Sequence, residues 1–176
     1  MDQTLDQRIQ ALRNLPSRDI FDLASQKIPE DKIPLAYIAG LNEKEQILCL
    51  RASLICLEVT DGAQVPREMQ LRAVVADQNG GDSLTSAGTG SGKTLPIALN
   101  FLLDDPRMEP VTLTISPLKR LQSTQANDFS NKYNVPTMTI NEDTPRDDAW
   151  WDVSRKLYFV FATLTPSGKC LQFQNG

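Results

Sequence analysis

Residues 87–94 decide what fold this chain can adopt, and they read Ala87-Gly88-Thr89-Gly90-Ser91-Gly92-Lys93-Thr94. The three glycines permit backbone conformations closed to other residues, so successive N–H groups can turn inward around phosphate oxygens. A helix starting near Gly92 would add free N–H donors and partial positive charge at the same place. Lys93 would then reach the β- and γ-phosphates, and the Thr94 hydroxyl would hold Mg²⁺. We predict a phosphate-binding loop, with Ala87 where the strict pattern has glycine.

Composition narrows the classes of protein that remain. The chain has 176 residues, of which 40% are apolar and 23% charged, which allows a globular core. The net charge of −4 means that nucleic acid could be bound only through a local patch. The absence of histidine excludes His-based triads and His metal sites. Three cysteines without CxxC spacing indicate reduced thiols in an intracellular protein, and neither a secretory signal nor a membrane-spanning run is visible.

The first 60 residues have helical periodicity. One helix should end before Pro16, and Ser17 could cap a second. The strongest helix signal has Asn42 as N-cap with Glu45 three residues later, and it continues to Leu57. We interpret the apolar stripes of residues 4–57 as packing surfaces, and a partner-binding role stays open.

From Pro66 onward, helices and strands alternate. A helix should begin at Pro66 and end at Asn79-Gly80-Gly81, and residues 82–86 should form a short strand that leads into the loop. Further helices are expected after the loop, over 118–129 and around Trp150, and further strands over 111–115, 137–140 and 157–162. This order predicts an α/β fold with a parallel sheet, in which the phosphate loop follows the first strand.

Two stretches outside the loop carry a resemblance. Arg67 and Gln70 form an Arg-x-x-Gln pattern with its glutamine 23 residues before Lys93 (93 − 70), and a second stretch comprises Ser116, Pro117, Leu118 and Gln125. Together with the loop these residues resemble the first RecA-like domain of RecQ-family DNA helicases, although Thr124 stands where that family has aspartate. The resemblance covers about residues 66–163.

The resemblance implies a role for each matching residue. Arg67 and Gln70 would read adenine, which agrees with the ability of an amide to donate and accept hydrogen bonds at once. Residues 87–94 would bind ATP and Mg²⁺, with Lys93 as the catalytic residue, and Ser116, Pro117, Leu118 and Gln125 would contact DNA. The family also implies a nuclear location. We expect a helical region at 1–62, a partial RecA-like P-loop NTPase domain at 63–164 and a polar tail at 165–176.

The sequence shows no convincing pair of the catalytic carboxylates that such an enzyme needs. Hydrolysis needs carboxylates that hold Mg²⁺ and orient water, and no Asp or Glu follows Asp152. Glu142 and Asp143 fit that role poorly. We therefore expect the ATP-binding portion of a helicase, cut off before its catalytic acids and inactive alone. The alternatives are a non-catalytic nucleotide-binding module and, disfavoured by its scattered arginines, a small-molecule P-loop kinase.

Overall fold

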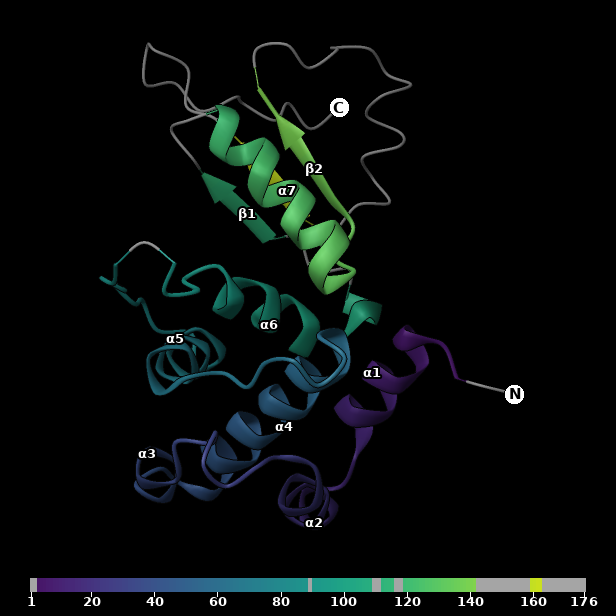
Figure 1. Ribbon diagram of the computed structural model, residues 1–176, viewed down its shortest axis with the longest axis vertical. Helices are drawn as coiled ribbons and strands as arrows, with labels where there is room; N and C mark the ends of the chain where they lie inside the picture. Colours follow the sequence, from purple (N-terminus) through teal and green to yellow (C-terminus); the bar gives the residue numbers. More distant parts are fainter. Residues whose placement is uncertain (1–2, 89, 109–111, 116–118, 142–158, 163–176) are drawn as a thin grey trace. The chain divides into compact units, whose positions relative to one another are not determined.

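The computed structural model describes residues 3–88, 90–108, 112–115, 119–141 and 159–162. It divides into two compact units, Met1–Asp104 and Asp105–Gly176. Figure 1 shows helices α1 to α6 in the first unit, and α7 with the labelled strands in the second. The expected helix around Trp150, the acids Glu142 and Asp143 and the polar tail at 165–176 lie outside the described residues.

Helix α4 (Glu43–Val59) is the central element of the first unit. Its buried residues include Ile47, Cys49, Leu50 and Ile55, which point in several directions around the helix axis. Such a helix must be covered on most sides, because apolar surface is driven out of water. The helices that pack against it are α1 (Leu5–Asn14), α2 (Ser17–Lys27), α3 (Leu35–Ala39), α5 (Glu68–Gln78) and α6 (Leu95–Leu103).

Local sequence signals explain where most of these helices begin and end. Asn42 and Glu45 form the predicted capping box, in which Asn42 Oδ1 accepts from the Glu45 N–H at 3.0 Å. Helix α5 ends as predicted, with Gly80 at φ +72° and the Gly81 N–H donating to the Ala76 carbonyl at 2.8 Å. The predicted cap at Ser17 is wrong, because Ser17 is the first residue of α2 and Pro16 is its N-cap.

Arginine side chains tie the N-terminal helices to the rest of the first unit. Arg13 Nε donates to the Leu102 carbonyl in α6 at 2.6 Å, across 89 residues of chain. Arg51 on α4 donates to the carbonyls of Leu12 and Leu15 at 3.1 and 2.8 Å. The expected boundary between residues 62 and 63 thus falls inside one compact unit. The domain bounds from the sequence stay predictions.

The strand expected at residues 82–86 is wrong. Residues 81–88 have no regular secondary structure, and Leu84 is 98% exposed. The stretch Asp82-Ser83-Leu84-Thr85-Ser86 offers only one large apolar side chain, which is too little to bury a strand on two faces. Within the first unit, the chain therefore enters the glycine-rich loop from a mostly exposed segment without regular secondary structure.

The second unit holds a helix and three short parallel strands. Strands β1 (Thr112–Ile115), β2 (Thr137–Ile140) and β3 (Phe159–Ala162) pair in the order β1-β3-β2. Thr112 and Thr137 are both level with Phe159 in the register. Helix α7 (Lys119–Tyr133) packs on β2 and β3, and it begins one residue later and ends four residues later than expected. A 3-10 turn, η1 (Pro106–Met108), precedes the strands.

Among the described residues, no helix combines the length and apolar character that crossing a lipid bilayer requires.

Candidate functional site

The glycine-rich loop adopts the backbone conformations that its sequence requires. Gly90 and Gly92 have φ values of +80° and +77°, in the left-handed region that favours glycine. The Ser91 N–H donates to the Gly88 carbonyl at 3.3 Å, and the Leu95 N–H donates to the Gly92 carbonyl at 3.1 Å. The chain therefore curls tightly before it enters helix α6. Thr89, the remaining loop position, lies outside the described residues.

Lys93 is folded back onto this loop. Its Nζ donates to the Ala87 carbonyl at 2.5 Å and to the Gly88 carbonyl at 2.9 Å, while the side chain stays exposed. The ammonium group thus lies at the mouth of the loop, where two carbonyls compensate its charge. A phosphate group at this place would exchange these neutral acceptors for charged ones, which form stronger hydrogen bonds.

Thr94 lies at the junction between the loop and helix α6. It is the N-cap of the helix and half-buried, with φ −80° and ψ −21°. Pro96 follows in the first turn, where its missing N–H costs little. The buried Leu95, Ala98 and Leu99 anchor the helix in the core. The positive end of α6 is thereby held beside the loop.

Gln70 connects helix α5 to the loop and is only 5% exposed. Its Oε1 accepts from the Arg67 N–H at 2.7 Å, which caps the start of α5. Its Nε2 donates to the Gly92 carbonyl at 2.9 Å and approaches the Ser91 carbonyl at 3.5 Å. A Cβ atom on Gly92 would lie 2.6 Å from this Nε2. The amide therefore fits the loop closely and fills the space beside Gly92.

The structure brings most of the predicted nucleotide-binding residues together. Gln70 contacts the loop directly, and Arg67 is the N-cap residue of α5 with an exposed side chain. Ser91, predicted as part of the loop, has an Oγ that is buried without a hydrogen-bond partner in the part of the chain that the structure describes. A buried hydroxyl inside a glycine-rich loop is a suitable donor to a phosphate oxygen.

The predicted nucleic-acid contacts lie in the second unit. Ser116, Pro117 and Leu118 fall outside the described residues, whereas Gln125 is half-buried on α7 with an unpartnered Oε1. Gln122 was missed by the sequence reasoning: it is fully buried, and neither of its amide atoms has a partner among the described residues. Its spacing of seven residues before the buried Phe129 was the available signal, because that spacing puts both on one helical face.

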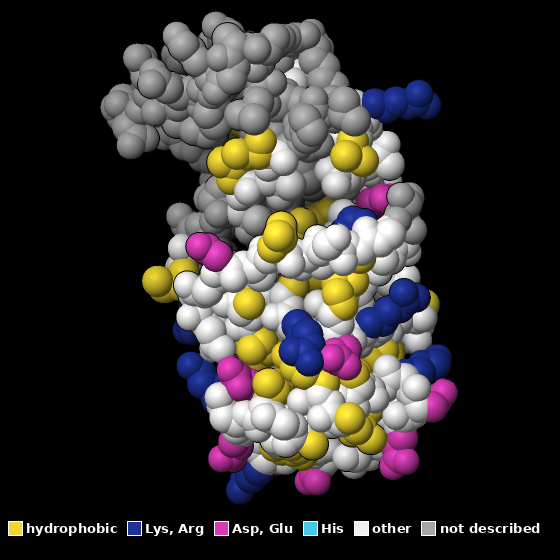
Figure 2. Space-filling model, turned by 90° about the vertical axis from the view of Figure 1, so that its left-hand side faces the viewer, with side chains coloured by type: hydrophobic (Ala, Val, Ile, Leu, Met, Phe, Trp, Pro, Cys, Tyr) yellow, Lys and Arg dark blue, Asp and Glu magenta, His cyan; other side chains and the backbone are white. Residues whose placement is uncertain are grey.

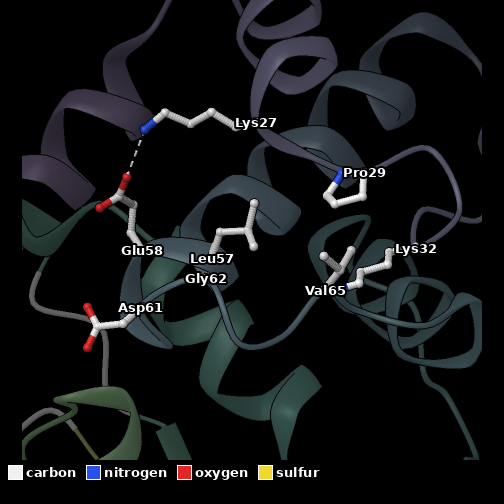
Figure 3. Close-up of a pocket in the computed structure, with 8 residues that line it drawn as sticks. All are labelled: Lys27, Pro29, Lys32, Leu57, Glu58, Asp61, Gly62 and Val65. Atoms are coloured by element: carbon white, nitrogen blue, oxygen red, sulfur yellow. Dashed lines mark hydrogen bonds and ion pairs between the residues drawn. The ribbon is translucent and has the colours of Figure 1, made fainter.

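Two pockets border the first unit. One, of about 430 Å³, lies between the outer face of α5 (Glu68, Met69, Arg72, Ala73) and residues 83–86, which lead into the loop. The other, of about 460 Å³, contains none of the predicted site residues. Figure 3 shows that there Lys27 extends toward Glu58, with which it forms an ion pair at 3.2 Å, while Lys32 and Val65 also line the pocket. Glu58 also binds Arg8 at 3.0 Å, so its charge is compensated within the protein.

Charge does not gather into one basic patch on the face shown in Figure 2. Among the described side chains there, Lys and Arg lie interspersed with Asp and Glu. Nor do three or more His, Cys, Asp or Glu residues come together as a metal site within the described ranges.

Comparison with known proteins identifies the family. Residues 67–170, more than half of the chain, match the DEAD/DEAH box helicase family. The chain belongs to this family. The match begins at Arg67, the N-cap of α5, and continues through the loop. The predicted resemblance to RecQ-like helicases is confirmed by a relative, the ATP-dependent DNA helicase hus2/rqh1 of Schizosaccharomyces pombe (strain 972 / ATCC 24843), which is 33% identical over 82 residues.

The shared region is short relative to that helicase. It covers 47% of this chain and 6% of the length of the yeast protein. No solved structure matches the chain. Membership of the helicase family implies a RecA-like P-loop fold and the use of ATP with a divalent metal. The glycine conformations, the position of Lys93 and the buried Ser91 hydroxyl fit such a ligand.

Proposed function

We propose that this chain is the ATP-binding portion of a RecQ-like DNA helicase and that it binds ATP·Mg²⁺ at residues 87–94. The contact between Gln70 and Gly92 supports this best, because it puts an amide able to read adenine next to a loop able to hold phosphates. The partial RecA-like domain at 63–164 and its parallel sheet belong to the same proposal.

Each predicted site residue has a role in this proposal. Lys93 leaves the carbonyls of Ala87 and Gly88 and neutralises phosphate charge, which makes it the residue closest to the chemistry. The backbone N–H groups of residues 87–92 surround the phosphates, and Thr94 holds Mg²⁺. Arg67 and Gln70 select adenine. The metal ion, when bound, neutralises charge that develops on the phosphates.

The nucleic-acid side of the proposal rests on the family. Ser116, Pro117 and Leu118, with Gln125 on α7, would contact the DNA backbone, and the complete protein would couple ATP hydrolysis to unwinding in the nucleus. A 176-residue chain without a recognisable pair of catalytic acids should not separate strands by itself.

Nucleotide binding by three matched variants tests this function. Isothermal titration of the full chain with ATP and GTP, both with Mg²⁺, should show a preference for ATP. Lys93→Ala should abolish binding of both nucleotides. Gln70→Ala should lower the ATP-over-GTP ratio by about tenfold, the equivalent of one hydrogen bond of about 1.4 kcal/mol. Gln26→Ala, which changes an exposed glutamine on α2, should leave both affinities unaltered.

Three results would contradict parts of the proposal. Equal affinity for ATP and GTP would remove the adenine-reading role of Gln70, and unchanged binding by Lys93→Ala would remove the phosphate loop. Strand separation by the purified chain would contradict its predicted inactivity. ATP binding without phosphate release, unaffected by added DNA, would instead favour the non-catalytic binding module.

A further inference from the structure

Helix α5 is attached to the N-terminal helices near the end that carries Gln70. The Arg72 guanidinium lies over the Tyr37 ring of α3, 4.5 Å from the ring centroid. The same guanidinium forms an ion pair with Glu68 at 2.8 Å. Arg72 follows Gln70 by two residues on the same helix, so the attachment to α3 lies within one turn of the amide that contacts the loop.

A second attachment holds the other end of α5. Asn79, its C-cap residue, donates from Nδ2 to Glu45 Oε1 at 2.8 Å. The other oxygen of Glu45 accepts from the Asn42 N–H at 3.3 Å within the capping box of α4. The single carboxylate of Glu45 therefore joins the start of α4 to the end of α5.

Between these attachments, α5 buries an apolar face. Leu71 and Val74 are fully buried, and the helix packs against α4 and α6. This apolar packing sets how far α5 lies from the core. It resists sliding of α5 along its own axis less well, because dispersion contacts are not directional. Tyr37 and Glu45 supply directional contacts at both ends of the helix.

The contact between Gln70 and the loop tolerates little movement of α5. Its Nε2 lies 2.9 Å from the Gly92 carbonyl, in space that is open only because residue 92 has no Cβ. A shift of α5 by about 1 Å would lengthen this hydrogen bond beyond useful range. Lys93 and Thr94, in contrast, lie at the start of α6, which is also held by packing against α4.

We propose that Tyr37 and Glu45, in the helices before the family region, are positioning residues for nucleotide selectivity. They hold α5 so that Gln70 stays aligned with the loop. This inference rests on the proposed function, because it takes Gln70 as the residue that reads adenine. It gives the N-terminal helices a role in adenine specificity, separate from phosphate binding.

The test compares paired substitutions in the full chain by titration with ATP and GTP. Tyr37→Leu removes the aromatic face, whereas Tyr37→Phe keeps it. Glu45→Leu removes the acceptor, whereas Glu45→Gln keeps an acceptor oxygen. Each leucine variant should lower the ATP-over-GTP ratio by about two- to fivefold, the range expected for an exposed cation–π or hydrogen-bond contact. The conservative variants should retain the ratio, and affinity for GTP should change by less than about twofold.

A double-variant comparison separates this role from general destabilisation. In a Gln70→Ala background, Tyr37→Leu should change the ratio no further, because the effect acts through Gln70. The inference is overturned if both leucine variants keep the ATP-over-GTP ratio of the unaltered chain. It is also overturned if Tyr37→Leu lowers this ratio in the Gln70→Ala background as much as it does in the unaltered chain. Neither result would contradict the proposed function. If Tyr37→Leu does not fold, Glu45→Leu at its half-buried position decides the question. If the unaltered chain does not prefer ATP, the proposed function fails as well.

Discussion

At the scale of single residues, Gly92 is the position where the site tolerates least change. Its φ is +77°, and a Cβ atom added at residue 92 would lie 2.6 Å from Gln70 Nε2. We expect Gly92→Ala to weaken ATP binding by at least about tenfold, because it both strains the backbone by about 1–2 kcal/mol and displaces Gln70. Titration with ATP and urea unfolding followed by circular dichroism would measure the two effects.

Two neighbouring glycines provide matched controls for that substitution. Gly90 has φ +80°, but a Cβ added there would meet nothing within 4 Å, so Gly90→Ala should show the backbone strain alone. Gly88 lies in open space with no such φ, and Gly88→Ala should lower stability least. If all three variants bind ATP equally, the close fit between Gln70 and Gly92 has no influence on the site.

The sequence allowed much of the site to be predicted at this scale, but not its contacts. The glycine spacing and Lys93 indicated the loop, and the helix before it was indicated by Pro66 and by Asn79-Gly80-Gly81. That Gln70 would donate to the Gly92 carbonyl was not predictable, since it depends on the packing of α5 against α6. The isolation of Ser91 Oγ among the described residues likewise follows from burial in the folded structure, and for Gln122 the spacing from Phe129 indicated the buried helix face but not the lack of a partner.

At the scale of elements, the cap of α4 offers a direct test. Asn42 Oδ1 accepts from the Glu45 N–H, and Glu45 in turn binds Asn79. We expect Asn42→Ala to lower the free energy of unfolding by about 0.5–2 kcal/mol, and Asn42→Asp to lower it much less, because aspartate also caps helices. Chemical denaturation would measure this. An alanine variant as stable as the unaltered chain would show that the capping box contributes nothing.

Element prediction succeeded where signals were local and failed where they were not. The helices with caps and stops, such as α4 and α5, were confirmed close to their expected bounds. The short α3 was missed, since five residues after Pro34 carry too little periodicity. The strand over 82–86 was wrong because a strand needs partners, and those five residues have no secondary-structure pairing within the described chain.

At the scale of the whole molecule, residues 1–104 share one core around α4, and this core contains the fully buried Cys49. Burial, and to a lesser degree the Glu45 carboxylate, raises the pKa of the Cys49 thiol from 9.0 to about 12. The unfolded chain therefore loses this proton at a lower pH than the folded protein. The free energy of unfolding should be retained below about pH 9 and decrease as the pH rises toward about 12.

Denaturation at several alkaline pH values would measure this dependence. Cys49→Ala should flatten it. Burial also raises the pKa of Tyr37, with Cys49 as the second cause, so Tyr37→Phe should remove a further part of the slope. A slope between about pH 9 and 11 that is the same in the unaltered chain and in Cys49→Ala would contradict the prediction.

The extent of this core was the least predictable feature. Sequence composition suggested a helical region that ends near residue 62, whereas the first compact unit continues to Asp104. Contacts such as that from Arg13 to the Leu102 carbonyl join segments far apart in the chain, and no short pattern encodes them. The resemblance could not help here, because it begins only after the N-terminal helices.

The double use of the Gln70 amide has a consequence for the thermodynamics of binding. The oxygen that would face adenine caps α5, and the nitrogen holds the loop. A ligand that binds this amide must break at least one of these hydrogen bonds. The free energy of ligand binding is therefore reduced by the amount that the broken hydrogen bond contributes to the folded site. Under our proposal, a substitution that strengthens the hydrogen bond from the Arg67 N–H to Gln70 Oε1 lowers the apparent affinity for adenine, while the attraction for triphosphate is unchanged.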